Sequence, residues 1–454
     1  MARVLFKDVD VIATLDAQGR ELAGGWVLVE ENRIAALGQG KVPKGPFDEI
    51  VSGQDKVIVP GLVNTHHHFY QTLFRAVPGA QDKQLFDWLV FLYERWRGID
   101  EEAVYVSAVV ACMELLLSGC TTTTDHLYLF PRGHRELIDV EIEAAQEVGI
   151  RFHPTRGSMS LSRDQGGLPP ADVVQTEQEI LEDSERLIRK YHDPALGAMV
   201  RIALAPCSPF SVTPRLMKET AALARRHNVL LHTHLAETLD EEQFCLEKFG
   251  VRPVEYLEEL GWLASDVWLA HVVHVNAQDI EKLARAGVGV AHCPSSNMIL
   301  GSGIAPIPEM LKAGVKVGLA VDGSASNDSS NMIREARQAM LLSRVKYGAE
   351  AMPARTGLRM ACLGGAQVLH RQAELGSIEV GKCADLVMFD LAELEFSGAA
   401  DPVAALLHCA AQYADFVMVN GKIVVRGGRF VDESLYRHMC RHREIAAKLV
   451  GAGV

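Results

Sequence analysis

Residues 57–71 read VIVPGLVNTHHHFYQ, an apolar run followed by a Pro-Gly step and three consecutive histidines. Because alternate side chains of a strand share one face, His66 and His68 can point the same way while His67 points to the opposite side. Two imidazoles at the end of a buried strand provide half of the ligands of a divalent metal ion. A surface histidine cluster is the alternative, and only the rest of the chain separates the two interpretations.

The length, composition and charge of the chain limit its class. Its 454 residues fit one large α/β barrel with an accessory domain, or two or three ordinary domains. Hydrophobic residues make up 48% and charged residues 23% of the chain, as in a soluble globular protein with a full core. A net charge of -13, without a basic stripe to neutralise phosphates, argues against nucleic acid as a partner.

The cysteines and the first residues indicate the compartment. The nine cysteines are scattered, odd in number and never spaced C-x-x-C, which is typical of reduced thiols in a cytosolic protein. Asp8 and Asp10 interrupt the first apolar stretch, unlike a secretory signal. No run approaches the roughly 18 apolar residues needed to cross a bilayer. We therefore expect a soluble, cytoplasmic protein without a membrane partner.

Apolar, strand-like runs alternate with longer helical patterns through the middle of the chain. The strand candidates end within residues 64–68, 122–126, 151–155, 201–206, 230–234, 267–271, 288–292 and 316–322. Several of the helical patterns between them close with Gly or Asn, as helix C-termini do. Eight such units predict a parallel sheet covered by helices, which is a (β/α)8 TIM-type barrel. A doubly wound open sheet is the alternative, but no G-x-G-x-x-G follows the first strand.

Both ends of the chain have the short, alternating patterns of β-strands. Residues 2–56 resemble residues 376–390 and 415–431 in this respect, and Asn420-Gly421 is a hairpin signal. We expect the two ends to pair into one discontinuous small β-sandwich. The predicted domains are 1–60 for the first part of the sandwich, 61–370 for the barrel, and 371–454 for the rest of the sandwich with a terminal helix.

Polar residues follow the predicted barrel strands, and in such a barrel the carboxyl ends of all strands meet at one pocket. Each histidine alone is more often structural than a ligand, but together they give three nitrogens, one carboxylate, a water position and a free carboxylate. We predict a metal site made of His66, His68, His234 and Asp322. The other polar residues at strand ends are Glu237, His271 and His292.

The chemistry of these residue types suggests a division of roles. A bound cation lowers the pKa of a water molecule, so that hydroxide is available near neutral pH. Asp322 can bind the metal through one oxygen and accept a hydrogen bond from that water through the other. Glu237 stays free to shuttle a proton. His271 is either a fourth nitrogen ligand or a donor that stabilises developing charge, and we favour the donor.

The identity and number of metal ions follow partly from what the sequence lacks. A bridged pair of metals in such barrels generally needs a carboxylated lysine or its equivalent, and the fourth strand segment, RIALAPCSPF, contains no lysine. We therefore expect one Zn2+ per subunit, although Fe2+ or Mn2+ suits the same donors. A different type of zinc site combines H-x-E with P-C-x-x-C, and the sequence lacks it, because Pro206-Cys207 is followed by Ser208, Pro209 and Phe210.

Four residues are candidates for contacts with a substrate. Gln71 offers an amide that can pair with a ring carbonyl and an N–H at once, although it can equally cap a loop. Trp88 can stack on a ring or pack its own helix. Cys207 can touch the substrate or be a small buried thiol, and His292 either lines the pocket or is structural.

Six segments together carry a resemblance to a known family. The sequence resembles the amidohydrolase superfamily over essentially its whole length, and HHHFYQTLFRA and LAPCSPFSV look like bacterial 8-oxoguanine deaminases, near isoxanthopterin deaminase and triazine hydrolases. Guanine deaminases carry an arginine where this chain has Ala205-Pro206-Cys207, which argues against guanine. The six matching segments are PGLVNTHHH, HTHLAE, LAH, HCPSSNMILGSG, VDGSASND and GSIEVGKCADLVMFD.

The resemblance implies hydrolytic deamination of an aminated purine-type heterocycle, with 8-oxoguanine converted to urate and ammonia. In this reaction Glu237 would protonate a ring nitrogen while Asp322 takes a proton from the nucleophile and later delivers it to the leaving amine. Isoxanthopterin, guanine or a triazine are alternative substrates, and a non-catalytic barrel is a remote alternative. We also expect a homo-oligomer, because barrels with an exposed apolar helix such as 101–118 often associate.

Overall fold

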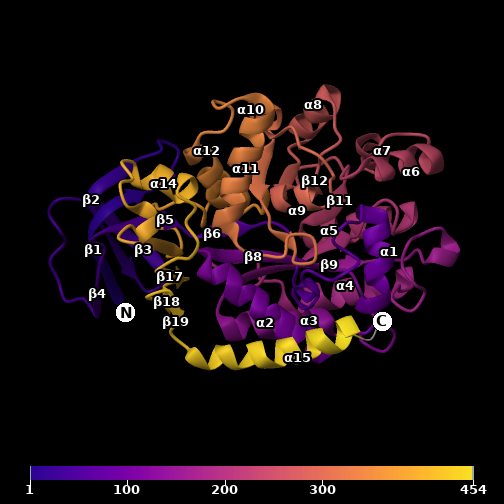
Figure 1. Cartoon of the computed structure of the whole chain (residues 1–454), viewed down its shortest axis with the longest axis horizontal. Helices are drawn as coiled ribbons and strands as arrows, with labels where there is room; N and C mark the ends of the chain where they lie inside the picture. The colour runs from indigo at the N-terminus through magenta and orange to yellow at the C-terminus, as the bar shows by residue number, and fades with distance from the viewer. Residues whose placement is uncertain (1, 452–454) are drawn as a thin grey trace.

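The computed structural model describes residues 2–451 and contains a closed barrel beside a separate mixed sheet (Figure 1). All eight neighbouring strand pairs of the barrel are parallel, so the predicted (β/α)8 fold is confirmed. Around the barrel the strands run β10 (Ala203–Pro206), β11 (Leu231–Leu235), β12 (Val267–His271), β13 (Gly289–His292), β14 (Lys316–Leu319), β6 (Leu62–Asn64), β8 (Cys120–Leu127) and β9 (Arg151–Ser158).

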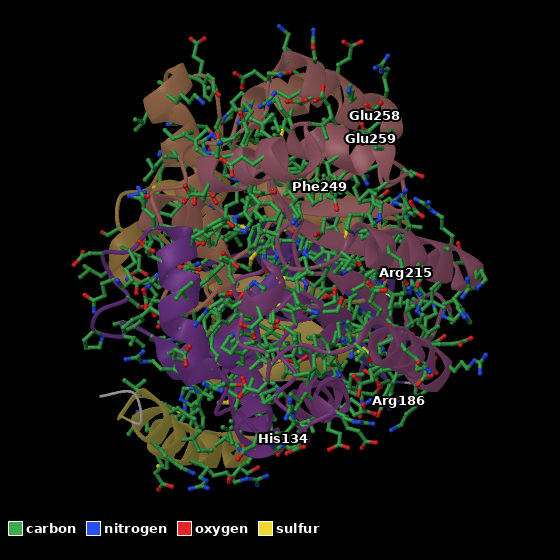
Figure 2. The ribbon with its side chains drawn as sticks, turned by 90° about the vertical axis from the view of Figure 1, so that its right-hand side faces the viewer. His134, Arg186, Arg215, Phe249, Glu258 and Glu259 are labelled. Atoms are coloured by element: carbon green, nitrogen blue, oxygen red, sulfur yellow. The ribbon has the colours of Figure 1, made fainter. Side chains whose placement is uncertain are left out.

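Helices surround the barrel, and their charged side chains, such as Arg215 and Glu258, extend outward (Figure 2). The helices are α1 (Leu85–Trp96), α2 (Glu101–Leu117), α3 (Leu137–Val148), α4 (Glu177–Tyr191), α5 (Pro214–His227), α6 (Leu239–Phe249), α7 (Pro253–Glu259), α8 (Ala277–Ala286), α9 (Pro294–Ile299), α10 (Ile307–Ala313), α11 (Met332–Tyr347), α12 (Ala354–Arg359), α13 (Gly365–Val368), α14 (Pro402–His408) and α15 (His438–Gly451). Short helical turns include η1 (Phe69–Phe74), η3 (Met360–Gly364) and η5 (Glu433–Arg437).

Local sequence signals set the ends of the barrel helices. Thr213 accepts a hydrogen bond from the N–H of Leu216 at the start of α5, and Pro214 occupies the first helical position, where its missing N–H costs nothing. Asn228 ends α5 in a left-handed conformation with φ 53°, and Gly287 ends α8 in the same way with φ 70°. These caps turn the chain from each helix into the next strand.

The second sheet joins both ends of the chain. Its strand β5 is parallel to β1 and antiparallel to β16, so the block of N-terminal strands and the block of C-terminal strands join into one sheet at the β5–β16 pair, as expected. The order is β19 (Arg429–Phe430), β18 (Lys422–Arg426), β17 (Phe416–Val419), β16 (Leu386–Asp390), β5 (Lys56–Pro60), β1 (Arg3–Ala13), β2 (Glu21–Glu30) and β3 (Arg33–Gln39), with β4 (Glu49–Ser52) beside β1.

The hairpin predicted at Asn420-Gly421 joins β17 to β18. Both residues have positive φ, 49° and 79°, as a two-residue turn matching the twist of the strands requires. The strands form one continuous mixed sheet around its own apolar core, which includes Phe6, Ile58 and Met418. Phe6 of β1 and Phe416 of β17 are three strands apart in this sheet, but their ring centroids are 5.4 Å apart, so the sheet folds over the core. The predicted domain boundaries near residues 60 and 370 stay predictions.

The predicted terminal helix, α15, leaves the sheet and runs along α2 on the outside of the barrel (Figure 1). Apolar side chains are buried on every side of α2, because α3 and α15 both pack against it. Arg441 of α15 makes a two-armed ion pair with Glu102 of α2 at 2.6 and 2.7 Å. The expectation that residues 101–118 are exposed is therefore wrong, and it no longer supports a homo-oligomer.

All nine cysteines are free thiols, and among them only Cys440 is exposed. No helix within residues 2–451 combines the length and the apolar character that crossing a membrane needs.

One ion pair ties the barrel to the sheet and can be tested. Arg151 of β9 is fully buried and donates to both carboxylate oxygens of Asp385, at 3.3 and 3.0 Å. Asp385→Ala leaves a buried, uncompensated charge, so we expect a loss of about 3–5 kcal/mol in the free energy of unfolding. Glu21→Ala is the matched control because it breaks an exposed pair with Arg355, worth at most about 1 kcal/mol. Urea and thermal denaturation measure both, and equal losses would contradict the assignment.

Candidate active site

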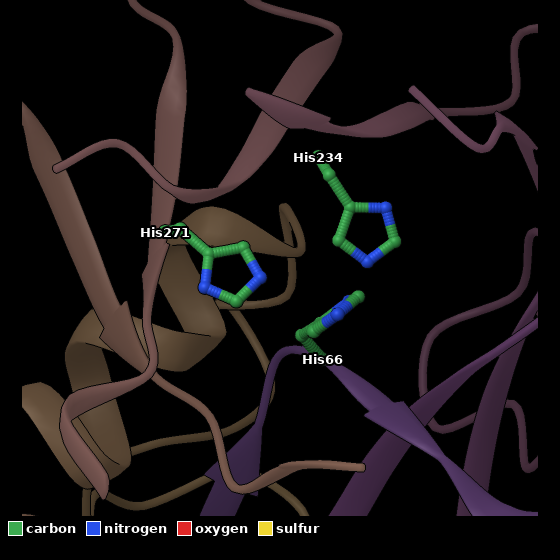
Figure 3. Close-up of side chains that lie close together, drawn as sticks. All are labelled: His66, His234 and His271. Carbon is green, nitrogen blue, oxygen red and sulfur yellow. The ribbon is translucent and has the colours of Figure 1, made fainter. Parts of the chain in front are cut away.

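The four residues predicted as metal ligands lie together at the carboxyl ends of the barrel strands. His66 follows β6, His68 lies in the two-residue strand β7 (His67–His68), His234 lies in β11, and Asp322 begins β15 (Asp322–Gly323). His68 Nε2 is 3.2 Å from His234 Nε2, and Asp322 Oδ1 is 3.2 Å from His66 Nε2 and 3.4 Å from His68 Nε2. Figure 3 shows the rings of His66 and His234 converging with that of His271.

Backbone carbonyls fix the tautomers of two of these histidines. His68 Nδ1 is 2.7 Å from the carbonyl oxygen of His126, and His234 Nδ1 is 2.6 Å from that of Cys207. A carbonyl oxygen only accepts, so both Nδ1 atoms carry the hydrogen and both Nε2 atoms present a lone pair. Two lone pairs 3.2 Å apart cannot hydrogen-bond with each other.

A third histidine is fixed through a relay. His232 Nδ1 donates to the carbonyl oxygen of Trp268 at 2.9 Å, so its Nε2 accepts from His66 Nδ1 at 2.8 Å. The Nε2 of His66 consequently presents a lone pair, has no hydrogen-bond partner and faces the carboxylate of Asp322. His232 therefore fixes the orientation of the His66 ring from the side away from Asp322.

These four groups fit a bound cation. Three nitrogen lone pairs and one carboxylate oxygen converge in a buried space, and all four can only accept hydrogen bonds. A positive ion among them removes the mutual repulsion, and three nitrogens with one oxygen suit zinc. Side-chain spacing alone also allows an ion among His66, His234 and His271, or among His66, His68 and His126.

His126 is a residue of the site that the sequence reasoning did not assign. It ends the TTTTDH segment of β8, its Nε2 donates to the carbonyl of Ala205 at 3.0 Å, and its ring stacks on that of His234 with centroids 4.9 Å apart. Its position at the carboxyl end of the second predicted strand was the sequence feature that could have identified it as a site residue. Only the tilt of the strands in the closed barrel shows that this side chain lies against His234.

Backbone strain is concentrated where these side chains enter the site. Ala236, His271, Val272 and Asp322 all have positive φ, between 50° and 70°. Residues other than glycine rarely adopt this conformation, which costs on the order of 1–3 kcal/mol each and is typical of functional sites. Here the left-handed turns at the strand ends direct the side chains toward the barrel axis.

Glu237 and His271 lie next to each other beside the ligand cluster. His271 Nε2 is 3.5 Å from Glu237 Oε2 and 3.9 Å from Asp322 Oδ2, and its Nδ1 donates to Asn297 Oδ1 at 2.9 Å. Burial raises the pKa of the Glu237 carboxyl to about 7. Burial alone would lower the pKa of His271, but the two carboxylates raise it. The geometry therefore provides a proton donor and acceptor side by side.

The HCPSSN segment anchors Asp322 and His271 by hydrogen bonds. Ser296 donates to Asp322 Oδ2 at 2.5 Å, and the neighbouring Asn297 accepts from His271. Both residues stand in a motif that the sequence singled out. Their individual contacts could not be inferred, because they depend on how α9 starts after β13.

Gln71, Trp88 and Cys207, three of the four candidates for substrate contacts, line the cavity above the cluster, and their contact with a substrate stays a prediction. His292 is buried in β13 and is not among the lining side chains. Gln71 Oε1 accepts from the N–H of Ala325 at 3.2 Å. The other lining residues are His68, Leu85, Leu89, Tyr93, Tyr128, Ser208, Phe210, His234, Glu237, His271, Leu300, Asp322 and Ser326.

A (β/α)8 barrel with three histidines, an aspartate and a free glutamic acid at its carboxyl end defines the class of metal-dependent barrel hydrolases. Comparison with known proteins gives the family: residues 57–426 match the Amidohydrolase family, and the chain belongs to it. The predicted resemblance is thereby confirmed.

Three relatives show how similar the chain is to characterised members. The 8-oxoguanine deaminase of Pseudomonas aeruginosa PAO1 is 51% identical over 97% of this chain and 98% of that protein. An isoxanthopterin deaminase from an unknown prokaryotic organism is 38% identical over 80% of this chain and 79% of that protein. The structure of atrazine chlorohydrolase TrzN from Arthrobacter aurescens TC1, complexed with zinc, has a TM-score of 0.92 at 33% identity, covering 98% of this chain and 100% of that chain.

The relay behind His66 predicts a measurable effect on metal binding. His232→Phe keeps a ring but removes the acceptor for His66 Nδ1, so we expect metal affinity to fall about 10- to 100-fold. Competition with a chelator measures this affinity. His274→Phe is the matched control, because His274 contacts the carbonyl of Ser302 and no predicted ligand. Equal affinities of the two variants would contradict the role of His232.

Proposed function

We propose that this chain catalyses the hydrolytic deamination of an aminated purine-type heterocycle, with 8-oxoguanine as substrate and urate and ammonia as products. The observation that carries the proposal is a buried glutamic acid, Glu237, held at the metal cluster but outside the predicted ligand set, in a cavity with apolar walls. Identity of 51% with an 8-oxoguanine deaminase over nearly the whole chain supports this substrate.

We further propose that one Zn2+ is held by His66, His68, His234 and Asp322. A zinc ion bound there supplies a water molecule of lowered pKa and a positive charge next to the reacting carbon. Fe2+ or Mn2+ suits the same donors. Zinc is preferred because the related atrazine chlorohydrolase was solved with zinc.

The chain's own residues move the protons. Asp322 accepts a proton from the attacking water, while Ser296 holds its Oδ2 atom in place. Glu237 protonates the ring nitrogen next to the amine-bearing carbon, so negative charge does not build up on the ring. Asp322 then passes its proton to the leaving amine, which departs as ammonia, and the second proton of the attacking water goes to Glu237 as the new carbonyl forms, so both carboxyl groups return to their starting states. His271 donates a hydrogen bond to the oxygen that forms on the attacked carbon.

Recognition of the ring is assigned to the cavity walls. Leu85, Trp88 and Phe210 provide apolar surface for a flat heterocycle. The amide of Gln71 keeps donor capacity beyond its contact with Ala325, so it can pair with a polar ring edge. Burial raises the pKa of the Cys207 thiol to about 12, which makes it a neutral contact. His292 is buried outside the cavity lining.

Isoxanthopterin is a second candidate, because an isoxanthopterin deaminase is 38% identical to this chain and a pterin is also a flat, aminated two-ring system. The proposed organisation is a catalytic barrel over residues 61–370 with an accessory unit made of residues 1–60 and 371–454. We place the enzyme in the cytoplasm, since all nine cysteines are free thiols.

Substitution of the proposed proton shuttle tests the mechanism. Glu237→Gln keeps the shape of the side chain but cannot donate a carboxyl proton, so we expect kcat to fall by about 10²- to 10⁴-fold. Elemental analysis should find the metal content unchanged, because Glu237 is outside the proposed ligand set. Turnover near the wild-type rate would remove Glu237 from the mechanism.

A substrate panel tests the reaction. We expect ammonia release from 8-oxoguanine at a kcat/KM at least tenfold above that for guanine, isoxanthopterin, cytosine and hydroxylated triazines. Release of an alkylamine or chloride from a triazine, without ammonia from any purine or pterin, would assign a different reaction to the same site.

A further inference from the structure

The short helix η1 carries Gln71 and depends on its neighbours for its position. All six of its side chains are buried, and no side chain caps its N-terminus. The hydrogen bonds of a 3-10 helix are poorer than those of an α-helix, so a single turn is held mainly from outside. One of its external supports comes from the opposite end of the sequence.

That support is a hydrogen bond between Thr72 and α15. Thr72 Oγ1 is 3.0 Å from His442 Nε2 and 3.3 Å from the carbonyl oxygen of Ser107 in α2. A carbonyl oxygen only accepts, so the Thr72 hydroxyl donates to Ser107 and accepts from the Nε2–H of His442. Burial lowers the pKa of His442 to about 4, which leaves its ring neutral near pH 7.

Helix α15 is docked by contacts that do not involve His442. Ile445 and Leu449 are buried against the barrel side, and Arg441 pairs with Glu102 at 2.6 and 2.7 Å. The ring of His438 packs edge-on against Tyr105, with centroids 5.7 Å apart. Loss of the His442 contact alone therefore leaves α15 in place and changes only the support of η1.

On the cavity side, Gln71 has little room and only long contacts. Its Oε1 accepts from the N–H of Ala325 at 3.2 Å, and its Nε2 is 3.4 Å from the hydroxyl of Tyr70. A Cβ atom at Gly323 would lie 1.9 Å from Gln71 Oε1, so the amide passes directly over this glycine. A small shift of η1 must therefore displace the amide.

We propose that His442 is a positioning residue for substrate recognition, which holds Gln71 in place through Thr72. This inference rests on the proposed function, in which Gln71 binds the polar edge of the heterocycle. Through this contact, α15 influences the affinity of the enzyme for its substrate, although α15 itself does not line the cavity.

Steady-state kinetics with the zinc-loaded enzyme test the inference. We expect His442→Ala to raise KM for 8-oxoguanine about fivefold, the effect of one net hydrogen bond, with kcat within about twofold of wild type. His442→Gln keeps an amide N–H near the same position and should restore most of the affinity. Arg441→Ala, which breaks the exposed pair with Glu102, is the matched control and should leave KM unchanged.

A double-mutant cycle and hydrogen exchange complete the test. Thr72→Val combined with His442→Ala should raise KM no further than either change alone, because both remove the same contact. Amide exchange of residues 69–76 should be faster in His442→Ala than in Arg441→Ala. An unchanged KM in His442→Ala, an equal rise in Arg441→Ala, or unchanged exchange would each overturn the inference.

Failure of the proposed function and failure of the positioning role give different results in these experiments. Wild-type enzyme that releases no ammonia from 8-oxoguanine would refute that substrate, whereas the exchange comparison would still report whether His442 holds η1. Ammonia release by wild type with no effect of His442→Ala would refute the positioning role alone.

Discussion

Four groups that can only accept hydrogen bonds lie in contact at the carboxyl end of the barrel. The rest of the structure depends on holding these mutually repelling acceptors together. The Nε2 atoms of His66, His68 and His234 and one oxygen of Asp322 lie within 3.2–3.4 Å of their neighbours in the cluster. Outside a protein such an arrangement would relax through protonation or rotation of the rings. Here backbone carbonyl oxygens accept from the Nδ1–H groups of His68 and His234, and His232 accepts from that of His66. The rings cannot rotate away, so a bound cation is the remaining way to offset the repulsion between the four acceptors.

The barrel explains how such an arrangement is maintained. Each predicted ligand comes from a different strand end or from the short strands β7 and β15, and strained left-handed residues turn the side chains inward. These strained residues stand at the ends of strands in a closed sheet, in which every strand is paired on both sides. Rigidity of the strands and precise direction of the side chains are therefore two aspects of the same architecture.

Much of this could be predicted from the sequence, because it depends on short-range periodicity. Eight apolar runs predicted the barrel, and the residues at or after their ends include the four side chains that converge as predicted ligands, together with Glu237 beside them. Contacts set by strand tilt or by distant segments could not be predicted. His126 was not assigned, His292 lies outside the cavity lining, and α2 is covered by α15 although its own sequence suggested an exposed apolar face. The residue-level roles at the site stay proposals.

The pairing of β5 with β16 has a consequence for the order in which the protein can form during synthesis. Strands near the N-terminus emerge first, but β16, β17 and β18 follow only after the whole barrel has been made. Until then β5 exposes an unpaired edge, which is a hazard for aggregation in a nascent chain. The sheet beside the catalytic barrel can therefore be completed only after the last strands have been synthesised. Helix α15, which contacts η1, is synthesised after those strands.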